Sequence, residues 1–110
     1  MTVGLARLTL FLSEAHSLKE KRMVLRRVKD LVREKFNVSI AEVGAANDLW
    51  QRAVLGIAAV GNDARFVESA LDEVVGFVRG KAEVTGEDRE TQTFNDGQAL
   101  VGSDFRHWQG

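Results

Sequence analysis

The order of two helical patterns and four short apolar runs along the chain most constrains the fold. Apolar residues recur at helical spacing from residue 18 to 36 and again between the turn at 61–63 and Gly80, so each segment has one side suited to burial. The first helical face comprises Val24, Leu25, Val28, Leu31, Val32 and Phe36, and the second comprises Phe66, Val67, Ala70, Leu71, Val74, Val75 and Val78.

Polar residues mark where these two helices begin and end. Ser17 suits an N-cap, with Glu20 three residues further on as its capping-box partner. The turn Gly61-Asn62-Asp63 supplies an N-cap for the second helix. Gly80 predicts an end of the kind in which a glycine follows the last helical turn.

Four shorter runs have the character of strands, over residues 3–12, 38–43, 52–60 and 82–94. The resulting order, β-α-β-β-α-β, predicts an α+β protein with a βαββαβ ferredoxin-like sandwich. In that fold a four-stranded antiparallel sheet carries two helices on one face. We expect one domain over residues 1–94 and an irregular C-terminal tail over residues 95–110, where no periodicity is found.

Composition narrows the classes of function. The 110 residues contain no cysteine, so disulfides, thiolate metal sites and a cysteine nucleophile are excluded. No stretch reaches the ~20 apolar residues of a membrane span, and we expect a cytoplasmic protein with no membrane partner. Only two histidines occur, His16 and His107, far apart in the sequence, so neither a metal site nor a cofactor is expected.

The net charge of −1 hides a basic segment. From Lys19 to Lys35, eight basic residues stand against three acidic ones, which gives +5 and leaves −6 for the rest. At 100° per residue, five of the basic residues fall within an arc of roughly 80°, away from the apolar face. Such a stripe indicates contact with a phosphate backbone, although a solvated helix face is the simpler alternative. The candidate RNA-binding residues are Lys19, Arg22, Arg26, Lys29 and Arg33.

The side of the sheet that faces away from the helices is the second candidate surface. If Leu8, Leu10 and Leu12 point inward, then Leu5, Arg7 and Phe11 point outward and form a candidate interface. The run 52–60 contains no aromatic residue, which argues against bases stacking on the sheet. A homodimer, or coverage by Phe105 and Trp108 of the tail, explains such a face better.

Trp50 and Arg52 lie in or next to the connector between the second and third strands. These two residue types dominate the energetics of many interfaces, so both are candidate partner contacts. The alternative is that Trp50 packs over the edge of the sheet.

No residue pattern indicates catalysis, and we expect a protein that is not an enzyme. Glu14, His16 and Ser17 share one short loop, whereas a catalytic triad needs groups that converge from separate elements. Acylphosphatase is an enzyme of this fold class and size, but it needs a phosphate-binding loop after the first strand. Here that loop is Ser13-Glu14-Ala15-His16-Ser17, which has neither glycine nor arginine.

Several segments, in fixed order, resemble the YlxP-like family of small bacterial proteins. They are Glu14-Ala15-His16-Ser17-Leu18-Lys19-Glu20-Lys21-Arg22, Phe36-Asn37-Val38-Ser39-Ile40-Ala41-Glu42-Val43, Asp48-Leu49-Trp50-Gln51-Arg52, Leu55-Gly56-Ile57-Ala58 and Asn62-Asp63. The resemblance covers residues 3 to about 94. It implies a ferredoxin-like domain of unknown function, with genes that often lie near those for translation and ribosome-maturation factors, and no established catalytic residues.

Two hypotheses follow for the function. The first is a non-enzymatic accessory factor that associates with ribosomal RNA or a ribosomal subunit through the basic helix. The second is a homodimeric module that binds a protein or a small ligand on the open sheet face.

Overall fold

The computed structural model describes residues 1–44 and 49–95. Its elements are β1 (Thr2–Phe11), α1 (Leu18–Lys35), β2 (Ser39–Glu42), β3 (Arg52–Gly61), α2 (Ala64–Arg79) and β4 (Glu83–Thr93). The predicted βαββαβ ferredoxin-like sandwich is confirmed. The tail that the sequence predicts over 95–110 lies, apart from Asn95, outside the described residues.

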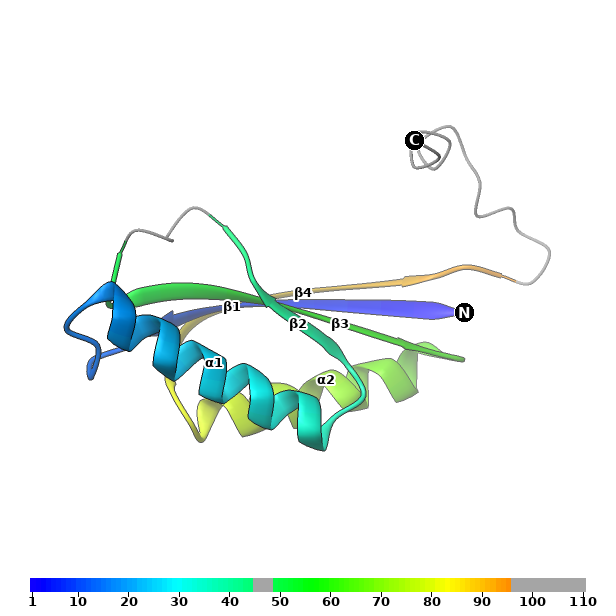
Figure 1. The fold of residues 1–110 in the computed structure, drawn as a ribbon. Coiled ribbons are helices and arrows are strands. Elements are labelled where there is room, and N and C mark those ends of the chain that lie inside the picture. The colour runs from blue at the N-terminus through cyan, green and yellow to red at the C-terminus, as the bar shows by residue number, and fades with distance from the viewer. Residues whose placement is uncertain (45–48, 96–110) are drawn as a thin grey trace, which may run out of the picture.

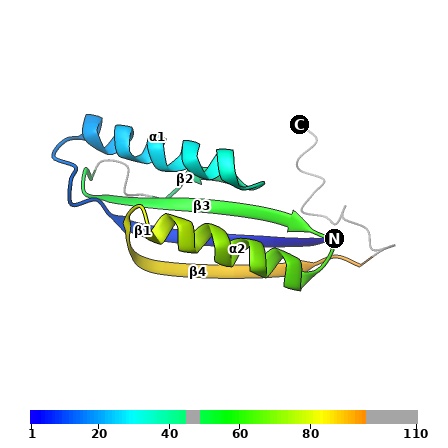
Figure 2. The ribbon, with the colours of Figure 1, turned by 90° about the horizontal axis from the view of Figure 1, so that it is seen from below.

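The four strands form one antiparallel sheet in the order β2-β3-β1-β4. Figure 1 shows both helices on one side of this sheet, while no described segment covers the other side. From the helix side, α1 lies towards β2 and α2 lies over β1 and β4 (Figure 2). We call the uncovered side the open face.

Buried and more exposed residues alternate strictly along β1 and β3, and this alternation decides which of them form the core. Leu8 and Leu10 of β1 and Leu55 of β3 have no exposed surface, while the odd-numbered residues of β1 and the even-numbered residues of β3 point to the open face. The predicted inward orientation of Leu8, Leu10 and Leu12 is confirmed.

Helix α2 packs closely against β1 at Gly4. A Cβ atom at this position would lie 2.3 Å from the Cγ1 atom of Val67 and 2.9 Å from the Cδ1 atom of Leu71. Because both of these side chains are fully buried, only glycine lets α2 pack this close to β1.

The ends of the helices agree in part with the caps that the sequence predicts. The Ser17 side chain accepts a hydrogen bond from the backbone N–H of Glu20, and Asp63 does the same for Phe66, so both predicted N-caps are confirmed. Helix α2 does stop at Gly80, but that glycine has a right-handed φ of −75°. A left-handed cap is therefore absent there, and the backbone N–H of Gly80 instead bonds to carbonyl groups of the last turn of α2.

Candidate functional site

The N-terminal end of α1 is fixed by a variant of the capping box. A side-chain oxygen of Glu20 accepts a hydrogen bond of 2.7 Å from the backbone N–H of His16, one residue before the Ser17 cap. The usual partner in this motif is the N–H of the cap residue itself. His16 therefore contributes its backbone to the helix start, while its residue as a whole is exposed.

The predicted basic stripe lies on the surface of α1. Lys19, Arg22 and Arg26 are exposed, and Lys29 is partly exposed. Among residues 1–44 and 49–95, none of these four side chains has an ion-pair or hydrogen-bond partner. Their charges are therefore available to a ligand without first breaking a contact within the protein.

Arg33, the fifth predicted member of the stripe, is held in place by the protein. Its Nη2 atom donates a hydrogen bond of 2.9 Å to the carbonyl oxygen of Ile40 in β2, and its Nη1 atom lies 3.6 Å from Asp30. Because Arg33 reaches β2, the stripe runs along the flank of α1 next to the β2 edge of the sheet. Figure 1 shows that α1 begins at the end of the molecule where β3 begins.

Lys21 is a charged residue that the sequence reasoning left out of every site. It is 2% exposed and shares the buried side of α1 with Leu25, Val28 and Val32. Its Nζ atom lies 3.3 Å from the Oε2 atom of Glu42 in β2, so the pair joins the helix to the edge strand. The helical spacing of Lys21 from Leu25 and Val28 is the signal that points to its burial.

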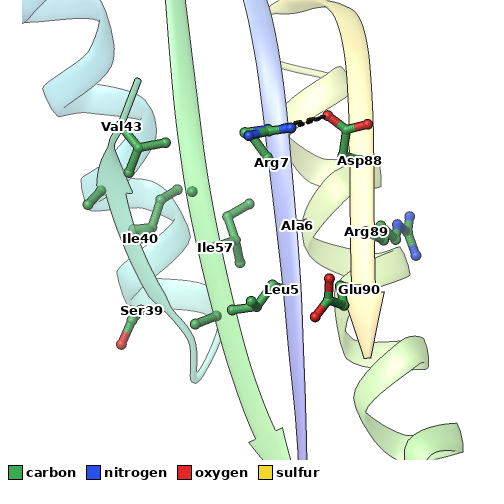
Figure 3. A pocket seen from close by; sticks show the side chains of 13 residues that line it. Leu5, Ala6, Arg7, Ser39, Ile40, Val43, Ile57, Asp88, Arg89 and Glu90 are labelled. Carbon is green, nitrogen blue, oxygen red and sulfur yellow. Dashed lines mark hydrogen bonds and ion pairs between the residues drawn. The ribbon is translucent and has the colours of Figure 1, made fainter. Parts of the chain in front are cut away.

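The open face contains a shallow hollow of about 540 Å³. It crosses all four strands, as Figure 3 shows, and the side chains of the open face that line it are mostly small or apolar. The predicted interface residues Leu5, Arg7 and Phe11 all lie on this face, and Leu5 is 47% exposed.

Charged groups of the open face gather along β4. Arg7 forms an ion pair with Asp88, its cross-strand neighbour, at 3.0 Å, and Glu90 is the neighbour of Leu5 (Figure 3). Both side chains of the Arg7–Asp88 pair are well exposed, so the pair itself contributes little to stability.

Arg52 is the first residue of β3 and Trp50 lies two residues before it, and β3 begins at the end of the molecule where α1 begins (Figure 1). Trp50 is 49% exposed, and Arg52 is exposed at the start of β3, where it pairs in register with Phe11. The other half of the Trp50 surface is covered, so a partner contact and packing over the sheet edge both stay predictions.

Ion pairs join the helix side of β4 to α2. Glu87 accepts hydrogen bonds from Arg79 of α2 and from Arg89, and Arg89 also bonds to Asp72 of α2. The hydrogen bonds from Arg79 and Arg89 hold the pKa of the Glu87 carboxyl below its ordinary value. The bond to Asp72 raises the pKa of the Arg89 guanidinium.

Within residues 1–44 and 49–95, no group of three or more His, Cys, Asp or Glu side chains is placed to hold a metal ion. No helix in those two ranges is long and apolar enough to cross a membrane.

The fold and the surface together define a class of protein: a small ferredoxin-like sandwich in which one helix has a basic flank and one face of the sheet is uncovered. Residues 3–91 match the model of the family described as "Protein of unknown function (DUF503)", and the chain belongs to that family. The resemblance to YlxP-like proteins is thus confirmed. The uncharacterized protein YlxP of Bacillus subtilis (strain 168) is 40% identical over 92 residues, which are 84% of this chain and 99% of that protein.

Two solved structures share the arrangement of the chain. A Deinococcus radiodurans protein assigned as an antibiotic biosynthesis monooxygenase has a TM-score of 0.47 and 14% identity, and the match covers 93% of this chain and all of that one. A de novo designed protein with a ferredoxin fold has a TM-score of 0.46 and 16% identity, over 93% of this chain and 95% of its own. At these identities the likeness concerns the fold alone.

Proposed function

We propose that this protein is a non-enzymatic cytoplasmic accessory factor that docks on ribosomal RNA, within a ribosomal subunit, through the basic flank of α1. The observation that carries the proposal is the set of four neighbouring cations without a partner among residues 1–44 and 49–95: Lys19, Arg22, Arg26 and Lys29.

The chemistry of these side chains suits phosphate. Arginine presents a planar fork of donors to phosphate oxygens, and a helix surface holds such groups at regular spacing. A folded RNA presents rows of phosphates, and its helices are recognised mostly by shape and backbone contacts. The absence of competing ion pairs on these four residues supports a role beyond simple solubility.

The surface extends beyond α1 in one direction. Trp50 and Arg52 share the end of the molecule where α1 begins, and both are exposed. An aromatic ring beside a cation suits an unstacked base or a ribosomal protein. Arg33 is assigned a smaller part in phosphate contact, since its guanidinium is already bound to β2 and Asp30.

The test is co-sedimentation of the protein with purified bacterial ribosomal subunits over a range of salt concentrations. Four phosphate contacts give a slope of about −3 in a plot of log affinity against log salt. The double variant Arg22→Gln, Arg26→Gln removes two contacts, so we expect weaker binding and a slope of about −1.5.

The matched control is Arg27→Gln, Arg65→Gln. It removes the same charge from two exposed arginines, of which Arg27 lies on another side of α1 and Arg65 lies in α2. We expect this variant to bind like the wild type. Affinity that does not change with salt, or an equal loss in both variants, would contradict docking through the stripe.

A further inference from the structure

We propose that the open face is the interface of a homodimer in which two sheets stack face to face. The twofold axis runs parallel to the strands and passes between β1 and β3. This inference rests on the open face and does not depend on the proposed RNA docking, although Arg52 is assigned to both surfaces.

The first observation is the amount of apolar surface left on this face. Leu5, Phe11 and Val43 are 47%, 40% and 37% exposed, and Val60 is 60% exposed. Leu5 and Phe11 belong to β1 and Val60 to the adjacent β3, while Val43 directly follows β2 and its backbone N–H bonds to Val54 of β3. The small residues Ala41, Gly56 and Ala58 fill the space between them. Contiguous apolar surface of this kind marks an interaction site.

The edges of the sheet suit a second copy poorly. β4 is a long edge strand, but it carries Glu83, Glu87, Asp88, Arg89 and Glu90 and has a register shift opposite Thr9 and Leu10. The other edge, β2, is only four residues long. The charges and the irregular register of β4 disfavour pairing at that edge, and the shortness of β2 disfavours it at the other. A second copy would therefore bind the open face.

The charges of the open face then select one orientation. Acidic residues of this face lie along β4, with Asp88 beside Arg7 and Glu90 beside Leu5. An axis perpendicular to the strands would place β4 across from the partner's β4 and bring these carboxylates together. An axis parallel to the strands instead places β4 across from the partner's β2, whose open-face residues Ser39 and Ala41 are uncharged.

In the same orientation, the open-face residues of β1 lie across from residues of the partner copy that suit them in size and charge. Register within the sheet aligns β1 and β3 row by row, so stacking puts β1 across from the partner's β3. Leu5 then lies across from the partner's Ala58, and Phe11 across from the partner's Arg52, a cation over an aromatic ring. Arg7 lies across from the partner's Gly56, where the missing side chain leaves room for the guanidinium.

The size of the face predicts a modest affinity. Three strands about 33 Å long and a fourth, β2, about 13 Å long lie about 4.8 Å apart and give a footprint of roughly 550 Å² per copy, or about 1,100 Å² for the pair. That area lies at the lower end for stable interfaces. We therefore expect a dimer that dissociates in the micromolar range.

The primary test is sedimentation equilibrium of the full chain between roughly 1 µM and 500 µM. The wild type should pass from monomer to dimer across this range. Leu5→Lys should raise the dissociation constant at least about tenfold, because two lysines would be buried at the interface. It should still fold, since the new side chain stands beside Glu90. Met23→Lys, with the same charge on the 63% exposed side chain of α1, should dimerise normally.

Orientation is tested by cross-linking, which the lack of native cysteine makes clean. Val60 lies in β3, next to the proposed axis, so Val60→Cys should cross-link to its own copy with a short bismaleimide. Met23→Cys should not. A dimer that is disrupted by Leu5→Lys but in which Val60→Cys fails to cross-link would overturn the orientation.

Other outcomes would assign the face to another occupant. A full chain that stays monomeric throughout the concentration range overturns the dimer. If replacing the tail residues Phe105 and Trp108 by serine then produced a dimer, residues 96–110 would be the natural occupant of the face. Both aromatic residues lie outside the described part of the chain.

Discussion

Lys21 has a place in the fold that its charge alone would not indicate. Its side chain is 3% exposed and its Nζ atom pairs with Glu42, whose side chain is 28% exposed. The Oε2 atom of Glu42 has no hydrogen bond within the described residues, so the nearby ammonium group is what compensates for its burial. A buried charge that loses its partner is costly, whereas replacing both charges is often tolerated.

We therefore expect Lys21→Met to lower the free energy of unfolding by about 3 kcal/mol. The double variant Lys21→Met, Glu42→Leu should recover most of that loss, because no charge is left uncompensated. Urea denaturation of the wild type, both single variants and the double variant measures the coupling between the two sites. Additive losses would show that the pair contributes nothing as a pair.

The sequence could predict that Lys21 is buried, but not what it meets. Its distance from Leu25 and Val28 places it on the apolar side of α1 by helical geometry alone. Its partner lies on β2, beyond a helix end and a turn, and only the tertiary fold brings the two together. The partner of Arg33 was unpredictable for the same reason, because the carbonyl group of Ile40 that accepts its hydrogen bond also belongs to β2.

At the scale of elements, β4 is joined to α2 by ion pairs on its helix side. Glu87 lies at the centre of this network, and Arg79 and Arg89 lower the pKa of its carboxyl. The folded state therefore favours the ionised form of Glu87 more than the unfolded chain does. Stability from this group is present above about pH 4.5 and is lost as the pH falls through the folded pKa.

Glu87→Gln should accordingly destabilise the protein by about 1 kcal/mol near neutral pH, and by much less near pH 3. Urea denaturation across this range, with wild type and variant side by side, gives the difference at each pH. Glu73→Gln is the control, because Glu73 is an exposed carboxylate of α2 without an ion-pair partner in the described ranges. A destabilisation that stays constant with pH would contradict this assignment.

Sequence patterns predicted some elements better than others, for a physical reason. β1 and β3 are central strands with one buried side, so alternation of apolar residues fixes which side faces the helices. β4 is an edge strand whose helix side carries Glu87 and Arg89, so its pattern is weak. Gly86, which pairs with Thr9 beside the register shift, is a local sequence signal of that irregularity. The open face itself was predictable, because Leu5 and Phe11 alternate with the core leucines of β1.

For the whole molecule, the two proposals constrain each other. Stacking two open faces turns the helices outward, so the basic stripes of the two copies lie on opposite sides of the dimer. A single RNA surface then meets only one stripe. The second copy adds no phosphate contact and remains bound only through the sheet interface.

Binding at protein concentrations above the dimer dissociation constant should therefore saturate at about two copies per subunit, with the salt slope of a single stripe, about −3. Leu5→Lys should saturate at one copy per subunit with the same slope, because it removes the second copy and leaves α1 untouched. Quantitative co-sedimentation at high protein concentration measures both values. A steeper slope for the wild type than for Leu5→Lys would mean that both stripes contact the same RNA, which stacked open faces do not allow.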